Sequence, residues 1–295
     1  MLTTIACPLC GSRDDRTLHE RRPPGFDFAA EMTTDVYAAY GRIARCSRCG
    51  MVYRNPREPD ERILQAYAAL EDGDYLLERE CRGMNALNSL RAVKRHVAKG
   101  RLLEVGCATG FFLNAARLEF DVCGVEPSAW AARIARERFG LDVHLGPLSS
   151  FDPERGPFDV VALIDLVEHV LDPRDLLATV ARLLVPGGVL YLVTPDITSL
   201  SARLLGSRWW GLRPAHLTYF SRRTMTRLLD ETGLSVREIR SYGRIFTYGY
   251  WLSRLRNYPA PVRGPVGAAV RSLGWQDKIL YLDTRDSMEV VAVRR

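Results

Sequence analysis

Four cysteines near the N-terminus are spaced as metal ligands are. Cys7 and Cys10 form one C-x2-C pair, Cys46 and Cys49 form a second, and 35 residues separate the two pairs. Two such pairs can present four thiolates tetrahedrally to one Zn²⁺. Because four protein ligands leave no position for a reactive water, the pattern predicts a structural zinc site in a small zinc-ribbon-like module.

A glycine-rich turn in the middle of the chain could bind a nucleoside. The turn Gly106–Gly110 follows the apolar run Leu102–Val105 and opens a predicted helix, and Glu126 ends the next strand 20 residues after Gly106. Glycines permit a tight turn and close backbone approach, and free amides at a helix start attract anionic groups. A carboxylate at Glu126 can accept both ribose hydroxyls. The glycine spacing differs from the dinucleotide pattern G-x-G-x-x-G.

The spacing of apolar residues predicts the helices and strands that position the glycine turn and Glu126. Residues 60–98 repeat apolar side chains at helical spacing, and from residue 101 short apolar runs alternate with helical segments. Asp172 and Pro173 begin one such helix, which is expected to end at Pro186. The alternation predicts an α/β fold with a parallel, doubly wound sheet. The expected strands are 102–105, 122–125, 142–145, 158–164, 189–193, 236–239 and 289–293.

The chain is expected to divide into five segments. They are a zinc-binding module over 1–59, a helical linker that covers the nucleoside site over 60–99, an α/β core over 100–243, an inserted lid over 244–286 and a final core strand over 287–295. The lid interleaves aromatic side chains with arginines over residues 244–258. A nucleic-acid stacking surface, an interfacial helix and a plain packed cap are the alternatives for that stretch.

Residues 101–195 resemble the class I S-adenosylmethionine-dependent methyltransferases. The resemblance rests on Glu104-x-Gly106-x-x-x-Gly110, on Glu126, and on the turn at 183–188. The stretch from Asp165 to Pro173 is similar to the ubiquinone-biosynthesis-like branch of that class. The resemblance implies a Rossmann-like fold with a mostly parallel seven-stranded sheet, and S-adenosylmethionine as the cofactor. The cofactor-binding residues that it implies are Tyr75, Glu104, Gly106, Cys107, Ala108, Gly110, Phe111, Glu126, Pro127, Leu148, Ser149 and Asp165.

The chain departs from the family pattern at the adenine-binding position. Many family members carry an acidic residue after the third strand, where this chain has Gly146-Pro147-Leu148-Ser149. Adenine is therefore assigned to the backbone near Leu148 or to Ser149. The cysteine-bearing N-terminal segment is similar to the zinc-binding heads of bacterial methyltransferases that act on sugars and natural products.

Three side chains could remove a proton from the methyl acceptor: His216, His169 and Asp165. His216 follows the fifth predicted strand, where family members build the acceptor pocket, and a histidine suits a hydroxyl at physiological pH. A packing role for His216 is the alternative. Asp165, Glu168 and His169 also resemble a divalent-cation site of ubiquinone-type enzymes, and Mg²⁺ there is the less favoured reading.

The charge is uneven along the chain. Residues 1–60 carry 9 basic and 8 acidic side chains, whereas residues 196–295 carry 17 and 8. The excess at the C-terminal end favours an anionic partner, such as a phosphorylated or nucleotide-linked small molecule, although a coding bias toward arginine is an alternative. There is no apolar run of the roughly 18 residues that a membrane span needs. The N-terminus does not resemble a signal peptide, so a cytoplasmic location with reduced cysteines is expected.

These observations predict a methyltransferase acting on a small molecule, with O-methylation of a sugar or natural-product intermediate favoured. An RNA methyltransferase is the main alternative, but the nearly neutral N-terminal module argues against nucleic acid as a partner. C- or N-methylation of a nucleotide-linked sugar is a further alternative. A cofactor-binding protein without catalysis is disfavoured by the complete glycine turn and Glu126.

Overall fold

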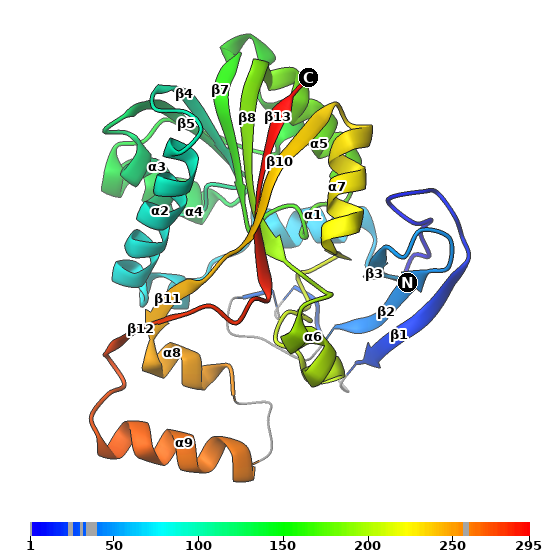
Figure 1. The fold of residues 1–295 in the computed structure, drawn as a ribbon, viewed down its shortest axis with the longest axis vertical. Helices are drawn as coiled ribbons and strands as arrows, with labels where there is room; N and C mark the ends of the chain where they lie inside the picture. Colours follow the sequence, from blue (N-terminus) through cyan, green and yellow to red (C-terminus); the bar gives the residue numbers. More distant parts are fainter. Residues whose placement is uncertain (1, 23–25, 30–31, 34–39, 256–259) are drawn as a thin grey trace.

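A seven-stranded sheet forms the centre of the protein. The computed structural model describes residues 2–22, 26–29, 32–33, 40–255 and 260–295 (Figure 1). The strand order is β10-β13-β8-β7-β4-β5-β6. The five strands β8, β7, β4, β5 and β6 are parallel, and β13 is antiparallel to both its neighbours. The predicted mostly parallel sheet is therefore confirmed. Its strands are β4 Gly100–Val105, β5 Phe120–Glu126, β6 Val143–Leu145, β7 Phe158–Ile164, β8 Leu184–Pro195, β10 Leu234–Ser241 and β13 Ser287–Arg294.

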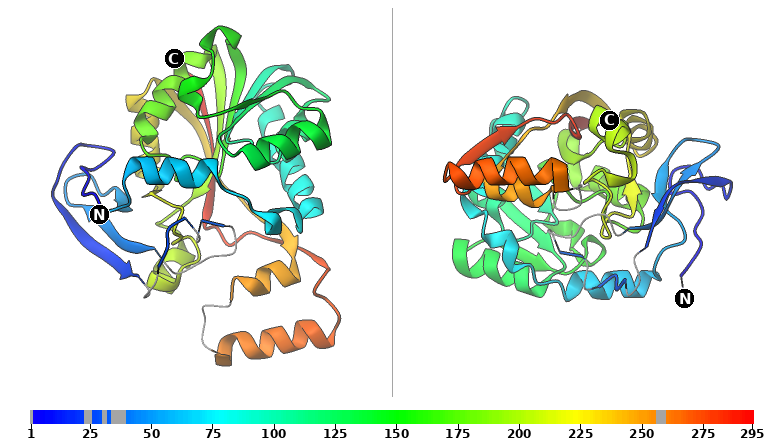
Figure 2. Two further views of the ribbon diagram at one scale, coloured as in Figure 1. Left: turned by 180° about the vertical axis from the view of Figure 1, so that it is seen from behind. Right: turned by 90° about the horizontal axis from the view of Figure 1, so that it is seen from below.

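Helices cover both faces of the sheet, as the alternating pattern requires (Figures 1 and 2). Helices α2 (Arg79–Lys94), α3 (Phe111–Ala116) and α4 (Ala129–Phe139) cover one face, and α5 (Pro173–Leu183) and α7 (Arg222–Glu231) cover the other. The strands alternate accordingly: Leu102 and Val160 are buried with α2 and α3, whereas Leu103 and Val161 are buried with α5 and α7.

One predicted boundary is wrong. Helix α5 ends at Leu183, and β8 begins at Leu184 instead of near Val189. Pro186 has no backbone N–H to donate to a helical carbonyl, and Gly187 has a φ of 78°. The chain therefore leaves the helix before Pro186, and the stretch up to Gly188 extends the following strand.

The N-terminal cysteines lie beside a second, smaller sheet, in which Cys46 ends a strand. Its antiparallel order is β1 (Asp15–Arg21), β2 (Gly41–Cys46), β3 (Val52–Arg54) and β9 (Thr218–Tyr219). Strand β9 follows β8 in the chain, so a segment from the catalytic part completes this sheet. Leu9 and Met51 also share one hydrophobic cluster with Leu177 and Met225 of the core helices. The module is thus packed directly on the core.

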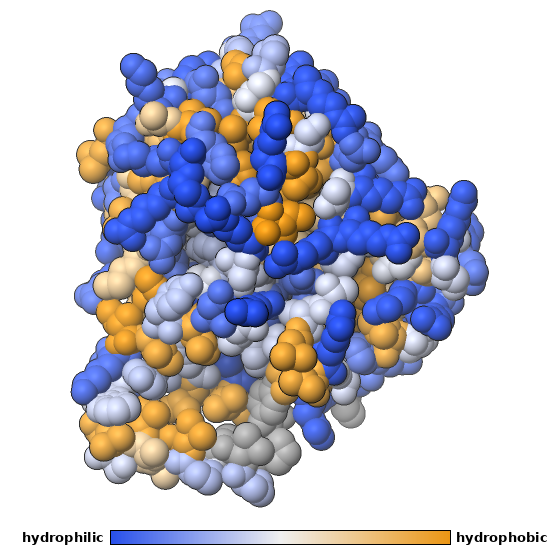
Figure 3. Space-filling view, in the orientation of Figure 1, coloured by the Kyte–Doolittle hydropathy of each residue, from blue (hydrophilic) through white to orange (hydrophobic). Residues whose placement is uncertain are grey.

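Three further segments lie outside the central sheet. Helix α1 (Asp60–Ala68) follows the small sheet, and α6 (Leu200–Leu205) follows β8. Strand β11 (Arg244–Thr247) pairs with β12 (Ile279–Leu282), and α8 (Tyr248–Ser253) and α9 (Ala260–Ser272) lie between them in the chain. Apolar side chains gather over this last segment, at the lower left of Figure 3. The end of the aromatic and arginine stretch, 256–258, lies outside the described residues. Within the described ranges, no helix is long and apolar enough to cross a membrane.

Candidate active site

A cavity of about 380 Å³ lies at the carboxyl ends of the parallel strands. Glu104 at the end of β4, Glu126 at the end of β5 and Ile164 at the end of β7 all line it. Ligands of open α/β sheets bind at this edge, because loops and helix N-termini converge there. The segment with β11 and α8 lines the other side of the cavity through Arg244 and Trp251.

Most of the residues predicted to bind the cofactor line this cavity. Gly110 does not appear among them; it begins α3 with a φ of 82°, and a side chain there would approach Leu141 within 2.5 Å. Leu148 and Ser149, in a short 3-10 turn after β6, are not among the lining residues either. The predicted residues that do line the cavity are Tyr75, Glu104, Gly106, Cys107, Ala108, Phe111, Glu126, Pro127 and Asp165.

The carboxylate of Glu126 is tied to the glycine turn. One of its oxygens accepts from the backbone N–H of Ala108 at 2.8 Å, and the other accepts from the N–H of Ser128 at 2.9 Å. Burial raises the pKa of Glu126, and these two hydrogen bonds oppose the rise. The side chain of Ser128 caps α4. This arrangement holds the carboxylate at the cavity wall, where a hydroxyl donor can reach it.

Glu104 and Thr109 present unsatisfied polar atoms at the same wall. Both side chains are buried, and Glu104 Oε2 and Thr109 Oγ1 have no hydrogen-bond partner in the structure. Burial, followed by the charge of Glu126, raises the pKa of Glu104 well above its usual value. A buried acceptor without a partner is costly, so these atoms fit a ligand that brings an ammonium or hydroxyl group.

Two histidines lie together in the wall of the cavity. The rings of His169 and His216 are 4.7 Å apart, and both line the cavity. Nδ1 of His216 lies 2.9 Å from the carbonyl of Gly211, and Nδ1 of His169 lies 3.1 Å from that of Ala215. A carbonyl only accepts, so Nδ1 of His216 carries the hydrogen and its Nε2 is left to accept a proton. Nδ1 of His169 also lies 2.8 Å from the Tyr67 hydroxyl, which can donate or accept.

The pKa values of both histidines are lowered. Burial and then the positive charge of Arg213 lower the pKa of His169 to about 4. Burial, the neighbouring His169 and Arg213 lower the pKa of His216 well below its usual value. Both rings are therefore neutral at physiological pH.

Asp165 lines the cavity and is paired with an arginine that the sequence does not indicate. Its carboxylate accepts two hydrogen bonds from Arg244, at 2.8 and 2.6 Å. Burial opposes ionisation, but the Arg244 charge outweighs it and lowers the pKa of Asp165. A carboxylate held in this way is a weak base. Among the described residues, the potential ligand atoms beside these histidines that lie within 4.8 Å of one another belong to Glu168, His169 and His216, and Asp165 is not part of this group.

Several lining residues were not expected from the sequence. Trp130 follows Pro127 at the start of α4 and lines the cavity in the region assigned to the cofactor. Arg82 of α2 also lines it, with its guanidinium 3.3 Å from the centroid of the Tyr75 ring. No local pattern indicated these positions. Arg254 lies 3.9 Å from the Tyr250 ring centroid, and here the interleaved aromatic and arginine residues did give a signal.

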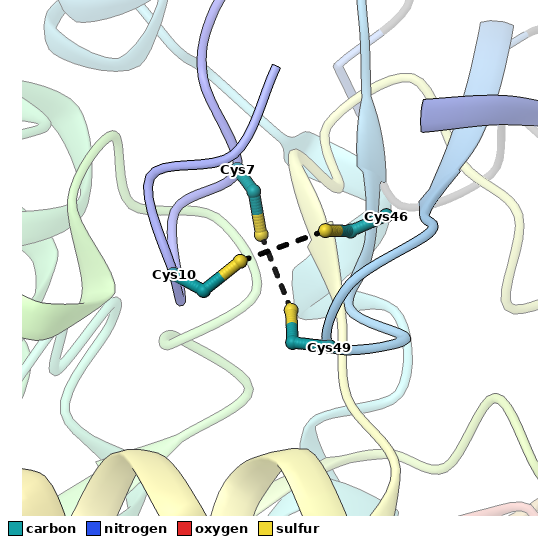
Figure 4. Close-up of side chains that lie close together, drawn as sticks. All are labelled: Cys7, Cys10, Cys46 and Cys49. Atoms are coloured by element: carbon teal, nitrogen blue, oxygen red, sulfur yellow. Dashed lines mark hydrogen bonds between the residues drawn. The ribbon is translucent and has the colours of Figure 1, made fainter. Parts of the chain in front are cut away.

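The four N-terminal cysteines converge on one point (Figure 4). The sulfur atoms of Cys7 and Cys49 are 3.5 Å apart, those of Cys10 and Cys46 are 3.6 Å apart, and all four are free thiols. Zn–S bonds of about 2.3 Å in a tetrahedron place sulfurs roughly 3.8 Å apart. Burial raises the pKa of Cys46, but backbone N–H groups of Cys49 and Arg48 lower it to about 7. The geometry and the donor set fit zinc.

The fold and the arrangement of the glycine turn are those of the class I S-adenosylmethionine-dependent methyltransferases. The chain belongs to the methyltransferase domain family, whose model matches residues 56–239. The cofactor is therefore S-adenosylmethionine, and the residues at the glycine-turn end of the cavity fit it.

Similar proteins match this chain over different lengths. A ubiquinone biosynthesis O-methyltransferase of Caulobacter sp. (strain K31) is 40% identical over 106 residues, which is 33% of this chain and 42% of that protein. This chain thus spans less than half the length of that relative. One from Xanthomonas oryzae pv. oryzae (strain PXO99A) is 27% identical over 208 residues, 62% of this chain and 87% of that protein. The YcgJ protein of Bacillus subtilis has the same fold, with a TM-score of 0.51 at 17% identity over 72% of this chain and 99% of that one.

Proposed function

We propose that the protein methylates a hydroxyl group of a small molecule, a sugar or another biosynthetic intermediate. The observation that carries the proposal is the neutral ring of His216, whose Nε2 is left to accept a proton in the cavity that holds the cofactor turn. The cofactor supplies a methyl group on a sulfonium whose departure leaves a neutral thioether. The protein must then align the acceptor and remove its hydroxyl proton.

The residues divide into two groups in this proposal. Glu126 accepts from the ribose hydroxyls, and Glu104 with the amides of the glycine turn receives the amino acid end of the cofactor. His216 takes the acceptor proton, and His169 is the second candidate. Tyr67 fixes the ring of His169, since its hydroxyl lies 2.8 Å from Nδ1 and donates to the carbonyl of Ala215.

A divalent cation at Glu168, His169 and His216 is disfavoured in this proposal. Burial and the charge of Asp165 raise the pKa of Glu168 to about 8, so this group holds a proton at neutral pH. The positive charge of Arg213 lowers the pKa of both histidines, and the same charge repels a cation. We expect added Mg²⁺ to leave turnover unchanged. Stimulation of several-fold would show that the three side chains do bind the ion.

The alternatives differ in what they require of the cavity. Buried aromatic side chains such as Trp209 line it, which suits a small acceptor better than a long RNA. Arginines 213 and 254 on the acceptor side suit a phosphorylated or nucleotide-linked acceptor. C- or N-methylation of a nucleotide-linked sugar is the second candidate function, because the same arginines serve it equally well. We further propose a cytoplasmic location, where the four thiols stay reduced.

The pH profile tests the role of the histidine. Protonation of the imidazole removes the base, so turnover falls as the pH falls through the histidine pKa. Because the pKa of His216 is lowered by burial, we expect kcat/KM to stay level down through about pH 6.5, the ordinary histidine value, and to fall only below it. An acid limb centred above pH 6.5 would contradict the assignment of the base to this buried ring.

We propose that Cys7, Cys10, Cys46 and Cys49 hold one structural Zn²⁺. Metal analysis should give about one zinc per chain, since a closed four-thiolate site holds one ion. Cys46→Ser should lower the stability of the N-terminal module and leave the affinity for S-adenosylhomocysteine within about twofold, because the cofactor turn lies elsewhere. Cys81→Ser is the matched control, as Cys81 is also a buried free thiol. A fully folded protein without metal would contradict the proposal.

A further inference from the structure

The loop that carries His216 is held by side chains from outside the catalytic core. Its successive carbonyls accept hydrogen bonds from different elements: Pro214 from the Nη1 of Arg54 at 2.5 Å, and Ala215 from the hydroxyl of Tyr67 at 3.1 Å. The backbone N–H of Arg54 also donates to the carbonyl of Leu217 at 2.9 Å. Arg54 therefore contacts this loop on both sides of the histidine.

Arg54 is a buried cation at the end of β3. It is 1% exposed, its Nη2 donates to Glu58 Oε2 at 2.5 Å, and its guanidinium lies 5.1 Å from the centroid of the Phe28 ring. A buried charge is costly unless it is paired and hydrogen-bonded. Here both partners are supplied, one from the N-terminal segment and one from the loop of His216. The Arg54–Glu58 ion pair therefore connects the N-terminal segment to the loop of His216.

The strand after His216 is fixed along both of its edges. On one edge, Tyr53 and Val52 of β3 pair with Thr218 and Tyr219. On the other, the N–H groups of Leu217 and Thr218 donate to the carbonyl of Glu168, at 2.8 and 3.1 Å. The backbone on the C-terminal side of His216 therefore lies between the zinc-binding module and the residue preceding His169.

We propose that Arg54, supported by Glu58, is a positioning residue for His216, so that the N-terminal module holds the loop that presents His216 to the cavity. Its hydrogen bond to Pro214 sets the turn from Gly211 to His216, and that turn brings the Gly211 carbonyl to Nδ1 of the ring. The importance of the proposal rests on the proposed role of His216. The hydrogen bonds of Arg54 do not depend on that role, and their effect on the His216 ring can be measured without a methyl acceptor.

The test uses the full-length protein with ¹⁵N-labelled histidine and records the ring nitrogens by NMR. His216→Gln identifies the His216 signals by their loss. In the wild type we expect one tautomer with hydrogen on Nδ1. The double variant Arg54→Met/Glu58→Leu removes the contact without leaving a buried unpaired charge, an exchange that proteins often tolerate. In this variant we expect His216 to show mixed tautomers, and amide exchange at Leu217 and Thr218 to be at least tenfold faster.

Arg42→Met is the matched control. Arg42 also forms an ion pair within the module, 2.6 Å from Asp15, and its contacts do not reach the His216 loop. The His216 signals of Arg42→Met should match those of the wild type. If the double variant does not fold, Arg54→Lys keeps the charge opposite Glu58 and loses the donor arm that contacts Pro214. Mixed His216 tautomers and faster amide exchange are then expected in Arg54→Lys. An unchanged single tautomer and unchanged amide exchange in a folded Arg54 variant would overturn the proposal. Failure of His216 as a base would leave this NMR result intact.

Discussion

Replacing His216 with alanine should lower turnover by roughly 10²–10⁴-fold, the usual range for loss of a general base. The affinity for S-adenosylhomocysteine should change by less than about twofold, because the cofactor residues lie at the glycine turn. In the structure Nδ1 of His216 is engaged by Gly211, and the ring is neutral and buried in the cavity wall. The measurement is steady-state methyl transfer to a hydroxyl acceptor, with the cofactor affinity taken from calorimetry.

His144→Ala is the control for that variant. His144 lies on β6, its Nε2 is 2.9 Å from the Ser150 hydroxyl, and it does not line the cavity among the described residues. We expect its turnover to match the wild type. Near-normal turnover in His216→Ala would move the base to His169, or would show that the acceptor brings its own nucleophile and that alignment alone carries the reaction.

Glu126→Ala should weaken the binding of S-adenosylhomocysteine by about 10- to 100-fold. Hydrogen bonds to a charged group are worth about 1.5–3 kcal/mol, and 1.4 kcal/mol is a factor of ten in affinity. The substitution also leaves the N–H of Ala108 without its acceptor, which loosens the glycine turn. Calorimetry on the two proteins measures the difference.

Glu137→Ala controls for the loss of a carboxylate from the same region. Glu137 lies on α4 and forms an exposed ion pair with Arg133. Surface pairs of this kind contribute little, so its affinity should equal that of the wild type. Equal affinities in Glu126→Ala and the wild type would reject the ribose role of Glu126.

The sequence predicts the parts of this site that depend on local patterns. The turn Gly106–Gly110 and Glu126 can be found because a strand, a glycine turn and a second strand follow one another within 26 residues from Arg101 to Glu126. The parallel strands can be found because their apolar runs are buried on both faces. The cysteine pairs can be found because zinc knuckles have a short, fixed spacing.

What the sequence does not predict depends on pairs of residues far apart in the chain. Asp165 has the same local surroundings whether it binds a cation or Arg244, and the arginine lies 79 positions later. Arg54 contacts Pro214 across 160 positions. Such contacts are set by how the elements pack, and no local spacing encodes them. Leu148 lies in the short turn after β6 and is not among the residues that line the cavity, so its assignment to adenine stays a prediction.

Methyl transfer from isotopically labelled S-adenosylmethionine tests the central claim most directly, with sugar nucleotides, phenols and RNA offered as acceptors. We expect the label on a hydroxyl oxygen of a small molecule, no label on RNA, and loss of the transfer in His216→Ala. Transfer to RNA alone, or to a carbon or nitrogen atom at an undiminished rate in His216→Ala, would contradict it.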